Sequence, residues 1–366
     1  MTTAKLFAPC ELNGLTLNNR IAMSPVTRAR ATEDGHVGEL QQIYYGQRGD
    51  AGLIFTEAVA VTPGGRGGPF LPGLWADSHV AGWRQVTGAV RARGGRIFCQ
   101  LWHAGRISHS SFSQNGEPPL AASPVPGEGR IFTPQGMVPY ETPRAMTLEE
   151  APVVKGWYRD AARRAREAGF DGVELHAAHS YLIDSFLRDM TNRRDDIYGG
   201  PVENRVRFVI EVLETLLEVW EPERVAIRIA PVGHAYNAWD SDPEPLFTHL
   251  VERLNGLRIG WLDLVEGDTG VSREAEPSFD LQKLRRLFRG VTIVNNLYDR
   301  QMAIDAVESG RADMVAFGRA FIGNPDLVRR LEAGAPLNEA PPAVYYQGGA
   351  KGYVDFPTLA EQAAAG

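Results

Sequence analysis

Cysteine is scarce in this sequence of 366 residues, which contains only Cys10 and Cys99. The two lie far apart and form no C-x-x-C motif, so we expect neither a disulfide framework nor a structural zinc site. Two thiolates are also too few for an iron–sulfur cluster, which needs about four. This use of cysteine predicts a reducing, cytoplasmic location.

Long apolar runs and blocks of basic residues are lacking as well. No stretch approaches the ~18 apolar residues in a row that a membrane span needs, and the N-terminal segment has no apolar core typical of a signal peptide. The net charge is −7, and no cluster of lysine and arginine stands out. We therefore expect a small-molecule partner, and neither nucleic acid nor a membrane. Monomer and homodimer both stay open.

Short β-branched runs alternate with amphipathic segments along the whole chain. Eight strands are predicted, each with a helical segment behind it, at residues 20–25, 53–58, 96–102, 172–176, 225–230, 261–266, 291–296 and 313–318. This alternation indicates a parallel sheet, and eight such units form a (β/α)8 TIM barrel. A doubly wound α/β sheet fits less well, because no G-x-G-x-x-G motif follows a strand. The sequence thus predicts an α/β fold with one barrel domain over residues 1–366.

Residues 103–147 hold most of the length beyond a minimal barrel, and they are rich in glycine, proline and serine. A loop of this length inside a compact domain is usually functional. Because it follows the third predicted strand, we expect it to lie over the mouth of the barrel.

Residues at the carboxyl ends of the strands build the active site of such a barrel. Here these ends offer amide, guanidinium, imidazole and phenol groups with almost no carboxylate: Pro25, Thr27, Glu57, Ala58, Gln100, Trp102, His103, His176, His179, Tyr181, Arg228, Asn295, Asn296, Gly318 and Arg319. This set suits a large, polar, anionic ring system. Gly318 and Arg319 lie where barrels commonly bind phosphate, although a turn glycine and a solvated arginine give the same pattern.

Arg228 is a cation inside an otherwise apolar strand, so it needs an anionic or polar partner. A structural ion pair would satisfy it, and so would a bound ring that becomes anionic on reduction. Gln100 has a donor and an acceptor to satisfy, which the edge of a heterocycle offers.

The segment H-A-A-H-S-Y at 176–181 allows three interpretations: half of a metal site, two hydrogen-bond donors beside a proton donor, or core residues at a strand end. A catalytic zinc site needs a third protein ligand. His103 and His234 are available, but few carboxylates lie at the strand ends. We therefore expect no metal.

Several segments together resemble the Old Yellow Enzyme family, also called the NADH:flavin oxidoreductase/NADH oxidase family. They are N-R-I-A-M-S-P-V-T-R-A-R-A, G-G-R-I-F-C-Q-L-W-H-A-G-R, the run from H-A-A-H-S-Y through L-I-D-S-F-L-R-D-M-T-N-R-R-D-D-I-Y-G-G-P, and the closing G-G-A-K-G-Y-V-D-F-P. The resemblance implies a (β/α)8 barrel with non-covalent FMN. It also implies reduction of activated C=C bonds in enones and enals, with NADPH or NADH as the reductant.

The resemblance implies a contact with FMN for eight residues: Pro25, Thr27, Ala58, Gln100, Arg228, Asn296, Gly318 and Arg319. Thr27 would bond the flavin near its C4 carbonyl and tune its potential, and Gln100 would pair with the pyrimidine edge. Arg228 would stabilise the reduced anion, and Gly318 with Arg319 would hold the phosphate.

The substrate contacts are implied in the same way. His176 and His179 would hold the carbonyl oxygen of an α,β-unsaturated substrate, and Tyr181 would protonate its α-carbon. Trp102, Phe70 and Tyr346 would shape the pocket around the substrate.

Two positions depart from the family pattern. Many relatives have a tyrosine where this sequence has Gly68. The glycine would enlarge the pocket or change which substrates it prefers. After the seventh strand, the run Asn295-Asn296-Leu297 replaces a glycine near the phosphate, where backbone N–H groups can still bind. Two other functions stay open: reduction of nitrate esters or nitroaromatics at the same site, and a flavin- or phenol-binding barrel without enone turnover.

Overall fold

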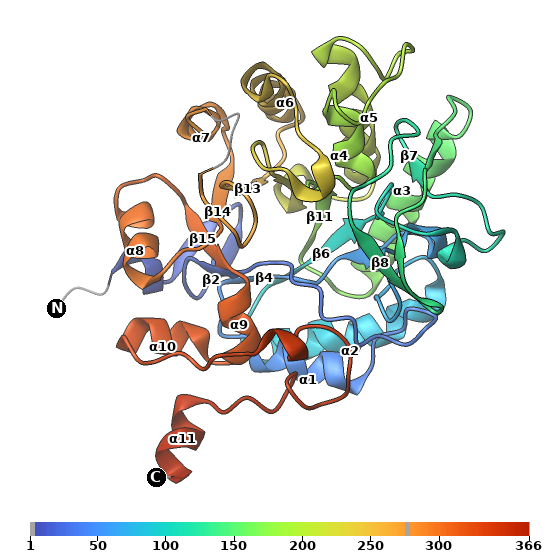
Figure 1. Cartoon of the computed structure of the whole chain (residues 1–366). Coiled ribbons are helices and arrows are strands. Elements are labelled where there is room, and N and C mark those ends of the chain that lie inside the picture. The colour runs from blue at the N-terminus through green and yellow to red at the C-terminus, as the bar shows by residue number, and fades with distance from the viewer. Residues whose placement is uncertain (1–3, 275–278, 366) are drawn as a thin grey trace.

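Eight short strands pair side by side in parallel and close into a barrel (Figure 1). The computed structural model describes residues 4–274 and 279–365. The barrel strands are β3 (Ile21–Met23), β4 (Leu53–Phe55), β6 (Ile97–Trp102), β11 (Gly172–Ala177), β12 (Val225–Ile229), β13 (Trp261–Val265), β14 (Val291–Asn295) and β15 (Met314–Phe317). Each pairs with the next, and β15 pairs with β3, which closes the ring. All eight predicted strands and the predicted (β/α)8 barrel are confirmed.

Helices follow the strands and most of them surround the barrel (Figure 1). They are α1 (Glu39–Gln47), α2 (Val80–Arg91), α3 (Ala151–Glu167), α4 (Leu182–Leu187), α5 (Val202–Leu217), α6 (Pro243–Leu257), α7 (Gln282–Leu287), α8 (Arg300–Glu308), α9 (Arg319–Gly323), α10 (Leu327–Ala333) and α11 (Leu359–Ala365). In α2, buried Val80, Trp83, Val86 and Val90 recur three or four residues apart, which places them on one face of the helix. Within the described ranges, no helix has the length and apolar character needed to cross a membrane.

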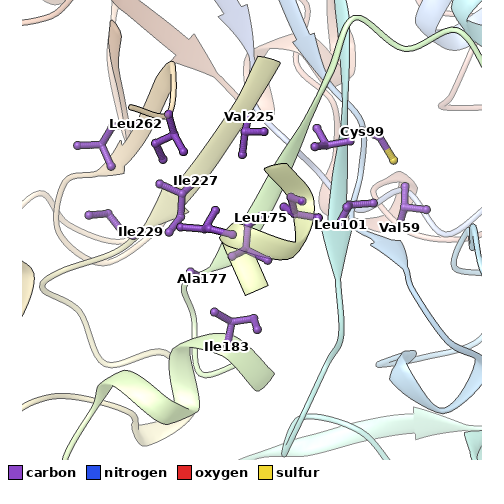
Figure 2. Packing of buried hydrophobic residues seen from close by; sticks show 14 of the residues in the cluster. Val59, Cys99, Leu101, Leu175, Ala177, Ile183, Val225, Ile227, Ile229 and Leu262 are labelled. Carbon is purple, nitrogen blue, oxygen red and sulfur yellow. The ribbon is translucent and has the colours of Figure 1, made fainter. Parts of the chain in front are cut away.

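In strand β11, alternate side chains serve two different parts of the structure: the apolar core between strands and helices, and the interior of the barrel. All six of its positions are buried, as is typical of a parallel strand covered on both faces. Val173, Leu175 and Ala177 belong to the core between strands and helices. Because side chains alternate along a strand, Glu174 and His176 point to the opposite side, into the barrel. Figure 2 shows Leu175 and Ala177 beside apolar residues of the neighbouring strands.

A second apolar cluster fills the barrel interior at the end away from the strand carboxyl ends. There Phe98 of β6 and Trp261 of β13, two strands that are not neighbours, meet edge-on with ring centroids 5.8 Å apart. An antiparallel hairpin of β1 (Cys10–Leu12) and β2 (Leu15–Leu17) packs against this cluster. The hairpin was not predicted from the sequence. Cys10, in this hairpin, and Cys99 are both free thiols.

The long segment 103–147 has structure of its own. It contains the short parallel strands β7 (Leu120–Ala121) and β10 (Arg144–Ala145) and an antiparallel hairpin of β8 (Arg130–Thr133) and β9 (Gly136–Pro139). Phe132 of this hairpin lines a cavity together with Thr27 and Tyr181, which follow the carboxyl ends of β3 and β11. The segment therefore lies over the mouth of the barrel, as predicted.

Replacing Leu175 by alanine tests how strongly the core fixes β11. Leu175 is fully buried, so the change leaves a cavity and lowers the free energy of unfolding by about 2–5 kcal/mol. A guanidinium titration of the FMN-loaded protein measures the loss. The control Leu337→Ala removes the same atoms from a side chain that is 43% exposed, and should change that free energy by less than about 0.5 kcal/mol. Equal losses in both variants would contradict the packing described here.

Candidate functional site

A cavity of about 740 Å³ opens at the carboxyl ends of the barrel strands. Most of the predicted site residues line it: Pro25, Thr27, Ala58, Gln100, His176, His179, Tyr181, Arg228, Asn295, Asn296, Gly318, Arg319 and Tyr346. Trp102 lines a second, adjoining cavity of about 450 Å³. The predicted pocket residue Phe70 lines neither of these two cavities. It packs beside Trp102 and Leu71 in a small apolar cluster.

A buried ion pair forms the floor of the main cavity. Arg228 Nη1 donates to Asp263 Oδ2, and the two residues face each other across β12 and β13. Asn295 of β14 completes the arrangement, since its Nδ2 donates to Asp263 Oδ1 at 2.6 Å while its Oδ1 accepts from Arg228 Nη2 at 3.3 Å. The predicted need of Arg228 for an anionic partner is thus met by Asp263. Loss of one partner of such a pair costs about 3–5 kcal/mol.

Two carboxyl groups of this floor were missed by the sequence analysis, which expected almost none. Glu174 Oε2 accepts from Gln100 Nε2 at 2.6 Å across β11 and β6. Burial raises the pKa of Glu174 well above its usual value, and the charge of Asp263 raises it further. Burial also raises the pKa of Asp263, against the opposing effect of Arg228. The sequence did contain a sign of these two residues, because Glu174 and Asp263 interrupt apolar strands just as Arg228 does.

Glu57, predicted at the end of the second barrel strand, positions the loop that carries Thr27. Its Oε2 accepts the backbone N–H groups of Arg28 at 3.0 Å and Ala29 at 3.1 Å. Burial raises the pKa of this carboxyl group. Glu57 therefore supports the cavity from behind and does not line it.

The turn after β11 brings His176, His179 and Tyr181 to the same wall of the cavity. The ring centroids lie 5.6 Å apart for the two histidines, 4.9 Å for His176 and Tyr181, and 6.5 Å for His179 and Tyr181. His179 and Ser180 both have left-handed backbone, with φ of 58° and 69°. Asp184 holds this unusual turn by accepting the Ser180 N–H at 2.7 Å, which compensates the strain of two such residues.

These three side chains are uncharged near neutral pH. Burial lowers the pKa of His176 well below its usual value, assisted by His179 and Arg228. Burial, Arg228 and Arg188 lower the pKa of His179 to about 3. Burial raises the pKa of the Tyr181 phenol well above its usual value. The wall thus presents two neutral imidazoles and one protonated phenol.

Hydrogen bonds around the two histidines differ. His179 Nε2 lies 2.7 Å from Thr269 Oγ1 in the loop after β13. The buried Nδ1 of His176 has no hydrogen-bond partner within the described part of the chain. A buried polar atom is normally paired, so His176 Nδ1 indicates a place where a ligand or an ordered water binds.

The two histidines that were considered as a possible third metal ligand, His103 and His234, lie outside this wall. His103 stacks on Trp157 with centroids 5.8 Å apart, and burial lowers its pKa to about 3. His234 lies beside Asp268, with Nδ1 3.9 Å from Oδ2. In the ranges that the structure describes, no group of three or more His, Cys, Asp or Glu residues is placed to hold a metal ion.

Gly318 and Arg319 occupy the opposite end of the cavity, at the end of β15. A Cβ on Gly318 would lie 3.2 Å from Val26 Cγ2, so a side chain there would crowd the wall. Arg319 Nη2 donates to the Gly270 carbonyl at 2.7 Å. The Asn296 side chain is bound to the loop after β13, because its Nδ2 donates to the carbonyls of Glu266 and Asp268 at 2.6 and 3.0 Å.

Comparison with known proteins agrees with this geometry. The model of the NADH:flavin oxidoreductase / NADH oxidase family matches residues 5–338. The chain is 39% identical to 12-oxophytodienoate reductase 7 of Oryza sativa subsp. japonica, over 98% of this chain and 95% of that one. It is 40% identical to a probable flavin mononucleotide-dependent alkene reductase of Leishmania infantum, over 97% of each.

Solved structures of two relatives have the same fold. Morphinone reductase in complex with tetrahydroNAD superposes with a TM-score of 0.91 at 43% identity, covering 97% of both chains. The Old Yellow Enzyme homologue from Zymomonas mobilis gives a TM-score of 0.93 at 41% identity, covering 97% of this chain and 100% of that one. With the matched family model, these likenesses show that the chain belongs to the Old Yellow Enzyme family and is an FMN-dependent oxidoreductase that uses a nicotinamide reductant.

Proposed function

We propose that this enzyme reduces the activated C=C bond of α,β-unsaturated carbonyl compounds. The observation that carries the proposal is the uncharged wall of His176, His179 and Tyr181, which offers two imidazoles and a phenol to one cavity. Names of relatives, an alkene reductase and a morphinone reductase among them, support the same class of reaction.

The residues of the cavity fit FMN. Gln100 and Arg228 lie on its floor, where a polar ring edge finds a donor, an acceptor and a cation. Gly318 leaves the wall free of a Cβ, and Arg319 supplies a second cation for a phosphate. We propose that Thr27, Gln100 and Arg228 hold the flavin ring, with Pro25 and Ala58 in contact through their backbone. Gly318, Arg319 and the backbone of Asn296 would hold the phosphate.

FMN held by these residues and reduced by NADH or NADPH would supply the hydride that the β-carbon of the substrate accepts. His176 and His179 then stabilise the negative charge that develops on the carbonyl oxygen. Neutral imidazoles suit this task, because each can donate one N–H while it adds no charge that must be desolvated. Preorganised donors of this kind usually contribute about 2.7–4 kcal/mol each.

Tyr181 completes the reduction by donating its phenolic proton to the α-carbon. Its raised pKa keeps the phenol protonated until the substrate carries negative charge. Trp102 fixes the orientation of the phenol ring, since the two rings meet edge-on at 88° with centroids 5.1 Å apart. Trp102 and Tyr346 would also bound the space that the substrate occupies, with Phe70 behind Trp102.

We further propose that the chain acts as one domain in a reducing, cytoplasmic compartment. The free thiols of Cys10 and Cys99 support the compartment. Stacking of Tyr353 on Tyr44 of α1, with centroids 4.2 Å apart, supports one domain because it joins the C-terminal segment to the barrel.

Replacing Tyr181 by phenylalanine should slow reduction of 2-cyclohexen-1-one by the pre-reduced enzyme by about 10²–10⁴-fold, because the general acid is lost. Reduction of the enzyme by the nicotinamide should keep its rate within about twofold. Stopped-flow absorbance measures both half-reactions. The control Tyr158→Phe removes a buried hydroxyl on α3 that has no partner among the described residues, and should leave both rates unchanged. Equal enone rates in Tyr181→Phe and the native enzyme would remove Tyr181 from the mechanism.

Replacing His176 by alanine should weaken the binding of phenolate-type ligands, which imitate the charged oxygen of the enolate. The loss of one donor predicts a dissociation constant for 4-hydroxybenzaldehyde at least about tenfold higher, measured by absorbance titration of the oxidised holoenzyme. His249→Ala, on α6 outside the barrel, serves as the control. Unchanged affinity in His176→Ala would refute the proposed oxygen site.

The enone half-reaction should show no inflection near 6.5 or 10, the ordinary pKa values of histidine and tyrosine. The pKa of His179 is lowered to about 3 and that of His176 is also lowered, so neither gains charge as the pH falls through 6.5. The pKa of Tyr181 is raised, so it stays protonated as the pH approaches 10. Single-turnover rates with 2-cyclohexen-1-one check this, with circular dichroism confirming folding at each pH. A rate that falls in acid with a midpoint near pH 6.5 would contradict this prediction. It would show that one of the two histidines has an ordinary pKa and that its charged form slows the reaction.

A further inference from the structure

The second cavity, of about 450 Å³, adjoins the proposed site and shares Thr27, Tyr181 and Tyr346 with the main cavity. Its outer walls come from segments far apart in the chain. Gly68 belongs to the segment between β5 (Val59–Ala60) and α2, Phe132 to the β8–β9 hairpin, and Tyr236 to the loop after β12. The proton-donating Tyr181 of the proposed mechanism therefore stands between the two spaces.

No charged side chain is present among the described residues that line this second cavity, whereas Arg228 and Arg319 line the main one. Aromatic rings form much of its wall. The rings of Tyr140 and Tyr236 meet edge-on with centroids 5.7 Å apart, and the ring centroids of Tyr236 and Tyr181 are 6.3 Å apart. A phosphate-bearing group would lose its hydration here without a compensating cation. The chemistry favours a neutral apolar group, and a ring in particular.

Gly68 keeps this space open. A Cβ built on Gly68 would contact only Leu71 Cδ1, at the ordinary distance of 3.7 Å. A Cβ on Gly67 would instead lie 3.0 Å from both the Trp102 ring and the Ile107 carbonyl. A larger side chain therefore fits the backbone at position 68, where it would take up part of the cavity.

The outer wall is held in place before any ligand arrives. Tyr236 has left-handed backbone with φ of 54°, and its carbonyl accepts the Glu128 N–H at 3.2 Å and Arg106 Nη2 at 3.3 Å. Asn237 Nδ2 donates to Glu128 Oε1 at 2.6 Å. These bonds tie the segment 103–147 to the loop after β12, so that little ordering is needed on binding.

We propose that the second cavity is a subsite for a neutral, apolar, ring-bearing substituent of the enone, remote from its C=C bond. This inference rests on the proposed function, because it assumes that the carbonyl group lies in the main cavity. The subsite would make bulky enones the preferred substrates, with Phe132, Tyr140 and Tyr236 as residues that determine specificity.

Equilibrium binding to the FMN-loaded, oxidised enzyme tests the subsite without turnover. The ligands are 2-cyclohexen-1-one and its derivatives with a phenyl group at ring carbon 4, 5 or 6, titrated by calorimetry. At least one phenyl derivative should bind at least about tenfold more tightly than the parent ketone, the smallest gain expected of an apolar pocket that gains a group. If no derivative binds more tightly, the proposal is wrong.

Two pairs of variants locate the effect. Phe132→Arg places a charge on the wall through a residue that is 45% exposed, and its control Met137→Arg changes the cross-strand partner, which is 51% exposed and does not line the cavity. Gly68→Tyr fills the cavity. Its control Gly64→Tyr lies in the same loop, where a Cβ would contact only Ser113 Cα at 3.8 Å.

Phe132→Arg and Gly68→Tyr should each weaken the favoured phenyl derivative at least about fivefold and leave the parent ketone within about twofold; the two controls should change neither. Equal weakening of both ligands, or no weakening by Phe132→Arg, overturns the subsite. Turnover assays separate this result from the mechanism. Selective binding of the phenyl derivative without reduction of any enone would refute the proposed function and leave the subsite standing.

Discussion

The buried guanidinium of Arg228 is the constraint on which the site depends. A cation inside the barrel must be neutralised, and the partners come from neighbouring strands, with Asp263 on β13 and Asn295 on β14. On the other side of β12, the register of β11 and β6 places Glu174 beside Gln100. The two groups of hydrogen bonds together form a polar layer across five strands, above the apolar cluster that fills the other end of the barrel.

Arg228 also contributes, after burial, to the neutral state of the two histidines in the wall above it. Its positive charge lowers the pKa of both His176 and His179, in the same direction as burial. The imidazoles stay neutral, so that each can donate one N–H, while the Tyr181 phenol keeps its proton because it too is buried. One fixed cation on the cavity floor therefore acts together with burial to keep both imidazoles of this wall uncharged. The strained turn at His179 and Ser180 is the local cost of bringing these side chains to one place.

The barrel and its strand ends could be predicted because they follow from local periodicity and from one rule, that strand carboxyl ends meet. Glu174 and Asp263 were missed although Arg228, which also lies inside a strand, was recognised, because each carboxyl group pairs with a polar side chain of a neighbouring strand and only the strand register shows that pairing. The β1–β2 hairpin was missed because two three-residue strands give almost no periodic signal. Phe132 and Tyr236 come together only through the folding of the segment 103–147 and a loop about one hundred residues later, and no pattern within either segment indicates that contact.

Anaerobic single-turnover absorbance is the most direct test of the central claim, that the uncharged wall serves reduction of a C=C bond. NADH or NADPH is added to the purified holoenzyme until the flavin absorption is bleached, and one equivalent of 2-cyclohexen-1-one follows. The account predicts that the oxidised flavin spectrum returns and that cyclohexanone forms in equal amount. Flavin that is bleached by the nicotinamide but stays bleached in the presence of the enone would contradict it.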